Sequence, residues 1–127
     1  MTRDEIIAKW DGMAPRERDA WVAEVVFGSK IVSVADDDDF HVELPSVGGI
    51  TACIILPRYT TDISAAWTVV DASKTEFLVR RRTCGLGYRA WVSLSRYDAS
   101  AGVSINSPSA SEAICLAAII AKLRPAV

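Results

Sequence analysis

Helical periodicity of apolar residues predicts four helices along the chain. In each, residues suited to a helix start precede apolar residues that recur three or four positions apart. The predicted helices run from Thr2 to about Ala8, from Ala14 to Val26, from Asp62 to about Ser73, and from Ser109 or Ser111 onward. We expect Thr60 or Thr61 to cap the third helix. On that helix Ile63, Ala66, Trp67 and Val70 share one face, which we expect to be buried.

Strict alternation of side chains predicts an antiparallel meander before the last helix. Phe77, Val79 and Arg81 would point to one side of a strand, and Leu78, Arg80 and Arg82 to the other. A hairpin turn over residues 84–87 leads to a strand over 88–95, and a turn over 98–102 leads to a strand over 103–106. Strands beside helices in this order indicate the α+β class.

The segment between the second and third helices has a weaker pattern. Residues 30–34 are typical of a strand, but four consecutive aspartates, Asp36 to Asp39, follow it and repel one another, which favours a solvated loop. We expect residues 36–57 to be largely irregular, with extended pieces at 40–44 and 51–56, or else to contain strands that the pattern does not reveal. The sequence as a whole predicts one antiparallel sheet of about four to five strands packed with helices.

Composition sets limits on the function. The 127 residues are half hydrophobic and about a quarter charged, which is typical of a single globular domain spanning residues 1–127. A formal net charge of -2 argues against strong nucleic-acid binding. The N-terminus is too charged for a signal peptide and no apolar run is long enough to cross a membrane, so we expect the protein in the cytosol. Three cysteines fit neither a paired disulfide framework nor a zinc site, and Cys53 and Cys115 are expected to be packing groups.

In four segments the chain resembles the phage ABA sandwich domain family, small proteins of phages and prophages. The matching segments are residues 1–7, 18–28, 57–70 and 111–121. The resemblance implies an alpha-beta-alpha sandwich, in which an antiparallel sheet lies between two helical layers, and a place in the host bacterial cytosol. The family carries no assigned catalytic residues, so the resemblance implies neither a reaction nor a cofactor.

Two polar clusters are candidate sites for a ligand or partner. Arg80, Arg82 and Arg89 lie near Trp91 across the predicted hairpin; guanidinium groups pair with phosphate, and aromatic faces stack on bases. Arg58, Tyr59 and Thr60 precede the third helix, where free amides suit an anion. The alternatives are a charged sheet edge that resists aggregation, and a simple helix cap. A nucleotide would require the two clusters to converge on one pocket.

The leading hypothesis from these observations is a non-enzymatic phage or prophage accessory protein that acts by binding. Its target in counter-defence would be a host protein or a nucleotide-like signal, a step that rests on analogy. The alternatives are a phage structural protein and a small metal-dependent hydrolase that uses Asp37, Asp39 and His41. No catalytic or metal-ligand spacing supports the hydrolase, and no cofactor is expected.

The last helix raises the question of a homodimer. Nine consecutive apolar residues, Ala113 to Ala121, are spread around its circumference. One buried face cannot accommodate all of them. Either the helix is enclosed within the domain, or its outer face pairs with a second copy of the chain; the sequence slightly favours the homodimer.

Overall fold

The computed structural model describes residues 1–34, 37–44, 46–73, 75–85, 87–94 and 102–123. Over these residues the helices are α1 (Arg3–Asp11), α2 (Pro15–Val26), α3 (Ile63–Ser73) and α4 (Ala110–Leu123), with a short 3-10 helix at Thr83–Gly85. The strands are β1 (Ile31–Val34), β2 (Asp37–Glu43), β3 (Cys53–Ile55), β4 (Phe77–Arg81), β5 (Tyr88–Ser93) and β6 (Gly102–Ser107). The predicted α+β class is confirmed.

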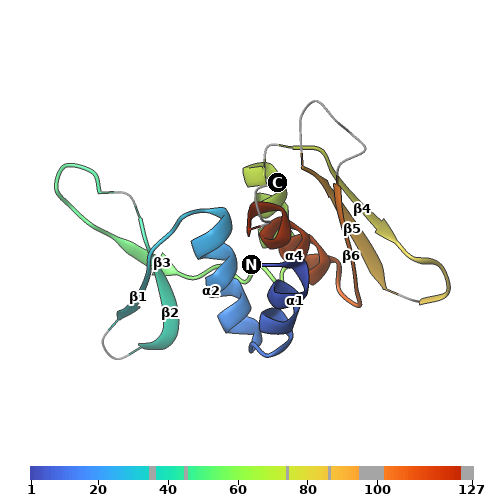
Figure 1. Ribbon diagram of the computed structural model, residues 1–127. Helices are drawn as coiled ribbons and strands as arrows, with labels where there is room; N and C mark the ends of the chain where they lie inside the picture. Colours follow the sequence, from blue (N-terminus) through green and yellow to red (C-terminus); the bar gives the residue numbers. More distant parts are fainter. Residues whose placement is uncertain (35–36, 45, 74, 86, 95–101, 124–127) are drawn as a thin grey trace.

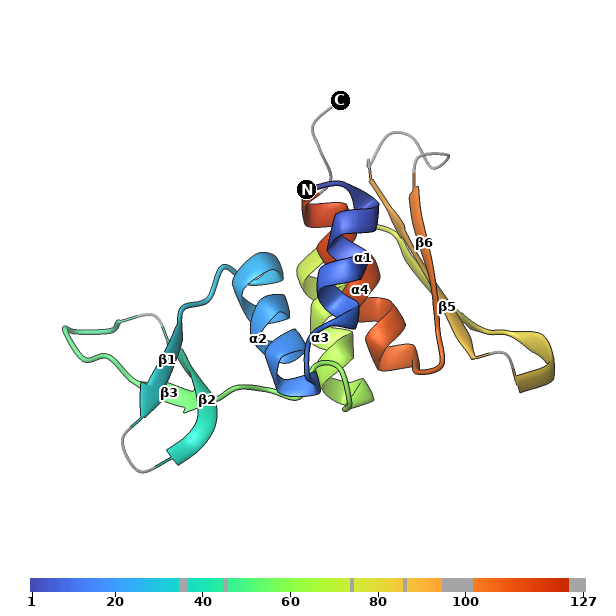
Figure 2. The same cartoon turned by 60° about the horizontal axis from the view of Figure 1, so that its bottom comes forward.

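The six described strands form two antiparallel sheets, ordered β1–β2–β3 and β4–β5–β6. Figures 1 and 2 show the helices standing between the two sheets, with α2 nearest to β1–β3 and α4 nearest to β5 and β6. The predicted meander is therefore confirmed as β4–β5–β6. The single sheet of four to five strands is replaced by two sheets of three, because residues 37–55 contribute two strands of their own.

The prediction of a solvated loop over the acidic run is wrong for residues 37–39, which begin strand β2. Positive charge reaches the run at Asp39, because Arg16 on α2 makes an ion pair with Asp39 at 2.8 Å. Asp36 lies outside the described residues, as does the predicted turn at 98–101.

Three of the four helices begin with the residues that the sequence analysis predicted for their starts. Thr2 and Glu5 form a reciprocal capping box on α1, Pro15 occupies the first turn of α2, and Ser109 Oγ accepts a hydrogen bond from the Glu112 amide at 3.4 Å. The cap of α3 is different. Asp62 Oδ1 accepts from the Ser64 amide at 2.9 Å, so the predicted caps Thr60 and Thr61 are replaced by Asp62.

Helix α4 is the centre of the core. Residues 113–120 are all buried, and the helix packs against α1, α2, α3 and all three strands of the β4–β6 sheet. The sheet contributes four buried side chains from its inner face: Ala90, Val92, Val103 and Ile105. Of the two alternatives for this helix, the structure shows enclosure. Its apolar circumference is covered by its own chain, which removes the reason for a homodimer through α4.

Two predictions of burial need correction. On α3, Ala66 and Val69 are buried, whereas Ile63 and Trp67 are about half exposed, so the core-facing stripe is rotated from the predicted one. Cys115 is buried as expected, but Cys53 is exposed, since β2 is the only described element that packs extensively against β3. The side chain of Cys84 lies outside the described part of the chain.

Candidate ligand-binding face

The outer face of the β4–β6 sheet is the leading candidate for a binding surface. Helices pack on the inner face, and none of the described helices lies over the outer one (Figures 1 and 2). The strand register places Leu78 beside Trp91 and Ser104 in one row, and Arg80 beside Arg89 and Asn106 in the next. The alternation predicted which residues of β4 and of β5 share a face, but not the register that joins them into rows with β6.

Six side chains of this face line a shallow recess of about 450 Å³; they are Glu76, Leu78, Arg80, Arg89, Trp91 and Ser104. The indole of Trp91 lies across Gly102, where any Cβ atom would collide with the ring. A glycine at this position of β6 therefore lets the ring lie flat on the sheet. Arg89 Nε donates a hydrogen bond to Asn106 Oδ1 at 3.0 Å, which fixes the guanidinium beside the ring.

The electrostatics of the recess favour an anion. Arg80 and Arg89 are directly opposite one another on neighbouring strands. Like charges in this arrangement repel and destabilise the pair. Among the described residues neither arginine makes an ion pair, and the Arg89 guanidinium donates only to the neutral Asn106 amide. A phosphate or carboxylate between the two guanidinium groups would relieve the repulsion and gain charge-assisted hydrogen bonds.

Arg82 does not join this recess. It is half-buried just after β4, where its backbone amide donates to the carbonyl of Gly87 at 2.8 Å across the hairpin. Of the four predicted residues in this cluster, the structure brings together Arg80, Arg89 and Trp91.

The second predicted cluster, Arg58 with Tyr59 and Thr60, lies elsewhere. In both views the segment between β3 and α3 is distant from the β4–β5 hairpin, so the two clusters do not form one pocket (Figures 1 and 2). Tyr59 is buried and stacks on Phe27 with 5.1 Å between ring centroids. Burial is the main reason that the pKa of Tyr59 is raised, and the nearby Asp19 carboxylate adds to the shift. Arg58 alone of the three is exposed.

Thr60 belongs to a buried polar network that the sequence did not indicate. Asp19 on α2 is fully buried and accepts hydrogen bonds from the Thr60 amide, from Thr60 Oγ1 and from Arg16 Nη1, each at 2.8 Å. Arg16 also donates to Asp39 Oδ1 and to the carbonyl of Leu56, both at 2.8 Å. The network links α2 to β2 and to the segment that leads into α3. Its polar groups are therefore bonded to one another and hold these elements together.

The geometry around Asp39 does not favour the hydrolase alternative. The Asp39 carboxylate accepts from Arg16 and lies 3.9 Å from Arg58 Nη2, while His41 Nδ1 is 3.2 Å from the Asp39 carbonyl. Two guanidinium groups beside a carboxylate compete with a cation for its oxygens. Among the described side chains, no group of three His, Cys, Asp or Glu could hold a metal ion. The side chain of Asp37 lies outside them.

The Asp39 contacts predict a loss of stability in acid. The hydrogen bond from Arg16 is the main reason that the pKa of Asp39 is lower in the folded protein than its ordinary value. A group with a depressed folded pKa contributes stability above its unfolded pKa, and that contribution is lost as the pH falls below about 4. We expect the urea midpoint of the wild type to fall in this range more than that of Asp39→Asn, which lacks the titrating group. If the urea midpoints of the two proteins fall by the same amount as the pH is lowered, the prediction is contradicted.

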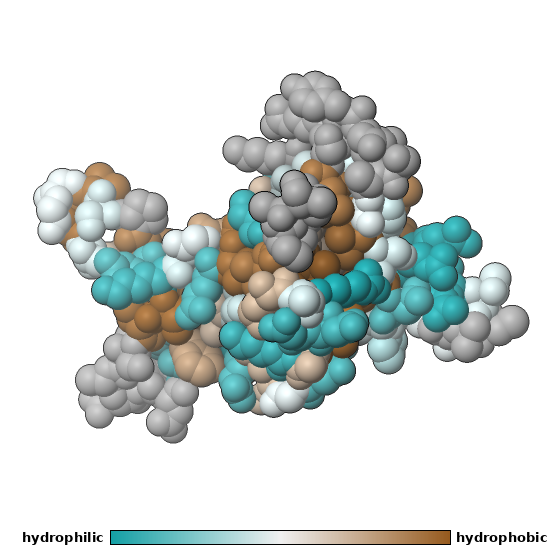
Figure 3. All heavy atoms as spheres, viewed as in Figure 1, coloured by the Kyte–Doolittle hydropathy of each residue, from teal (hydrophilic) through white to brown (hydrophobic). Residues whose placement is uncertain are grey.

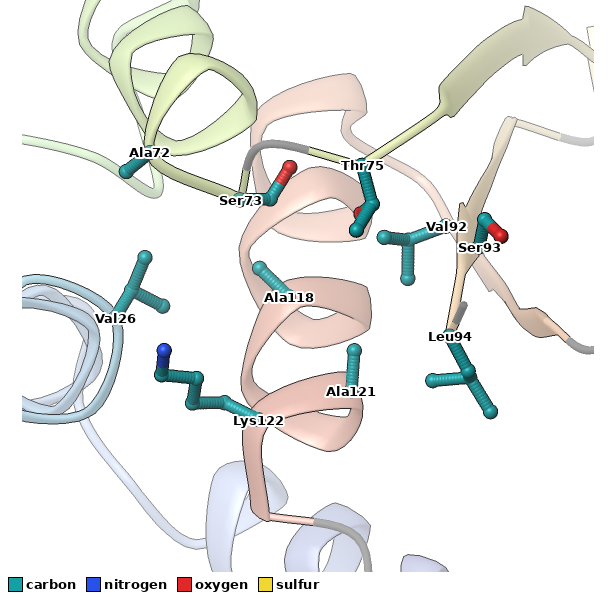
Figure 4. Close-up of a pocket in the computed structure, with 10 residues that line it drawn as sticks. All are labelled: Val26, Ala72, Ser73, Thr75, Val92, Ser93, Leu94, Ala118, Ala121 and Lys122. Atoms are coloured by element: carbon teal, nitrogen blue, oxygen red, sulfur yellow. The ribbon is translucent and has the colours of Figure 1, made fainter. Parts of the chain in front are cut away.

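Two other hollows in the described residues are less suitable for a nucleotide-sized anion. A cavity of about 110 Å³ lies between α2, α3, α4 and β5, with Lys122 reaching across it towards Val26 (Figure 4). It is well below the roughly 300–1,000 Å³ of ordinary ligand pockets. A hollow of about 500 Å³ beside α1 contains Arg3 and Arg18. Arg3 donates to the Ser104 carbonyl, and Arg18 pairs with Glu112 at 2.9 Å, so both cations already have partners.

Comparisons with known proteins agree with this fold. The phage ABA sandwich domain family matches residues 20–119. A crystal structure of a phage protein from Bacillus cereus superposes with a TM-score of 0.64 and 23% sequence identity, covering 87% of this chain and 93% of that one. At this identity the likeness shows the fold alone. No curated protein matches the sequence. None of the helices in the described ranges is long and apolar enough to span a membrane.

Proposed function

Since the chain belongs to the phage ABA sandwich domain family, we propose that it is a phage or prophage accessory protein that acts by binding, without catalysis, in the host cytosol. The family match supports a phage protein. The open sheet face supports binding. A counter-defence role, in which the protein sequesters a host signal, follows by analogy from the phage family.

The ligand that best fits the outer sheet face is a nucleotide-like molecule. The observation that carries this proposal is the pair of facing guanidinium groups, Arg80 and Arg89, next to the exposed side of the Trp91 ring. Arginine forks bind phosphate oxygens bidentately, and indole rings stack on bases. A recess of about 450 Å³ is within the size range of small-molecule sites.

The test is the melting temperature of the protein with nucleoside monophosphates, nucleoside triphosphates and cyclic dinucleotides as probes. A binder present at about 100 times its Kd stabilises the folded state by about 2.7 kcal/mol, which is a shift of several degrees. We expect at least one probe to give such a shift. Native mass spectrometry of protein purified gently from its producing cells would identify a ligand that is already bound.

A matched pair of variants locates the site. Arg80→Ala removes a cation of the recess, whereas Arg81→Ala removes the neighbouring cation, whose side chain projects from the other face of β4. A charge-assisted hydrogen bond contributes about 1.5–3 kcal/mol, so Arg80→Ala should weaken the binding of an effective probe roughly 10- to 100-fold. Arg81→Ala should leave it unchanged. Equal effects of the two variants would contradict the site.

A host protein is the second candidate target. The observation that favours it is Leu78, which is 56% exposed beside the two arginines on an uncovered sheet face. Exposed apolar side chains with adjacent arginines are typical of protein interfaces. Absence of both a melting shift with every probe and a bound small molecule would favour a protein target. Co-purification of one acidic host protein that is lost in Arg80→Ala would identify it.

A further inference from the structure

Strand β3 is an edge strand with an open hydrogen-bonding side. It pairs with β2 on one side, and within the described residues no strand pairs with the other. β2 is also the only described element against which β3 packs extensively. All three residues of β3 are exposed, with Ile54 at 44% and Ile55 at 58%. Figure 3 shows hydrophobic surface on the lobe that this sheet forms.

The β3 edge has only one of the features by which proteins protect open edges, its three-residue length. Such edges are also commonly protected by charged side chains, by proline or by a covering helix, and β3 has none of these among the described residues. Residues 51–56 contain neither a charge nor a proline. By contrast, β4, an edge strand of the other sheet, contains Arg80 and Arg81. An open edge without charge or proline, with exposed isoleucines, is a site for pairing with another strand.

We propose that β3 pairs antiparallel with β3 of a second copy of this chain, to form a continuous six-stranded sheet across a two-fold axis. Two identical strands in antiparallel register satisfy two-fold symmetry, so the assembly closes at a dimer. Neither strand carries a charge, so no like-charge repulsion opposes their pairing. The contact covers the exposed side chains of Ile54 and Ile55 of both copies.

A second copy fits this edge better than a foreign strand. The uncharged sequence from Thr51 to Leu56 offers no charge with which to select a particular foreign strand. Self-pairing requires only the symmetry of the strand itself. The proposal is independent of the ligand at the β4–β6 face, because β3 belongs to the other sheet.

The first experiment is size-exclusion chromatography with light scattering on the full chain over a dilution series. We expect the wild type to be a dimer and Ile54→Lys to be a monomer, because a lysine at the centre of β3 places two like charges in the contact. The matched control is Ile63→Lys on α3, since Ile63 has the same 44% exposure as Ile54. It should remain a dimer. The proposal would be overturned by a wild type that is monomeric at every concentration. It would also be overturned if Ile54→Lys and Ile63→Lys had the same oligomeric state in solution.

Cross-linking of Cys53 tests the strand pairing without a destabilising substitution. Cys53 is exposed on β3, whereas Cys115 is buried and burial raises its pKa, so it should not react. A short bis-maleimide should join two wild-type chains through Cys53, and Cys53→Ser should abolish this product. A dimer in solution that yields no Cys53 cross-link would show that the copies meet at another surface. If the protein is a monomer whose β3 pairs with a strand of a host protein, the proposed pairing with a second copy is also contradicted.

Discussion

Asp19→Ala is expected to lower the free energy of unfolding by about 3–5 kcal/mol, the usual cost of removing one partner from a buried ion pair. Asp19 is fully buried and accepts two hydrogen bonds from Thr60 and one from Arg16. The variant leaves the Thr60 amide without its acceptor in a site that is 1% exposed, and leaves the Thr60 hydroxyl only its longer hydrogen bond to the Pro15 carbonyl at 3.4 Å. Arg16 keeps its contact with Asp39, so the loss should lie in the lower part of that range.

Urea unfolding measures this loss as a shift of the midpoint at an unchanged slope. The control is Glu24→Ala, which removes an exposed carboxylate from the same helix and should change stability by no more than about 0.5 kcal/mol. The expected loss is a large part of the roughly 5–15 kcal/mol that stabilises a typical domain. If Asp19→Ala and Glu24→Ala unfold at the same urea concentration, the network does not hold α2 to the 56–60 segment.

Local patterns in the sequence were sufficient for the parts of the fold that depend on neighbouring residues. The caps at Thr2 and Ser109 act within three residues, and the alternation along β4 and β5 is a property of each strand alone. Such signals are local, so they can be predicted without knowledge of the tertiary structure. The same alternation placed Arg89 and Trp91 on one face of their strand, across the hairpin from Arg80, which is why the three could be predicted as neighbours. The register that pairs Arg80 with Arg89 was not predicted.

Features that depend on distant partners could not be predicted in this way. Asp19 meets Thr60 across 41 positions, and Arg16 meets Asp39 across 23. Without these partners, Asp19 resembles an ordinary surface residue of α2, and the acidic run resembles a loop. The rotation of the buried stripe on α3 has a similar origin, since the face that packs against α4 is decided by the shapes of both helices.

The buried network explains why Tyr59 and Thr60 looked like a ligand site in the sequence. Polar residues before a helix suit an anion, but here Thr60 is bonded to a carboxylate of the protein itself. Arg58 likewise lies near Asp39. The anion expected from the sequence is thus provided within the chain, at Asp19 and Asp39. The outer face of β4–β6 differs because, among the described residues, neither of its two facing arginines makes an ion pair, so the proposed anion would come from outside the chain.

The second large effect is expected for Ile119→Ala in α4, which should cost about 2–5 kcal/mol. Ile119 is fully buried, and its truncation both removes apolar contacts and leaves a cavity that the surrounding helices and sheet fill only in part. The matched control is the same substitution on α3, Ile63→Ala. Ile63 is 44% exposed, and alanine has the higher helix propensity, so this variant should be nearly neutral.

Thermal or urea unfolding of the two variants at several protein concentrations also distinguishes enclosure of α4 from its use as a dimer contact. An enclosed helix makes the loss in Ile119→Ala independent of concentration, because all the contacts of Ile119 lie within one chain. If α4 instead paired with a second copy, the loss would depend on concentration, since dissociation would be coupled to unfolding. Because residues 113–120 are buried in a single chain, we expect the same loss at every concentration.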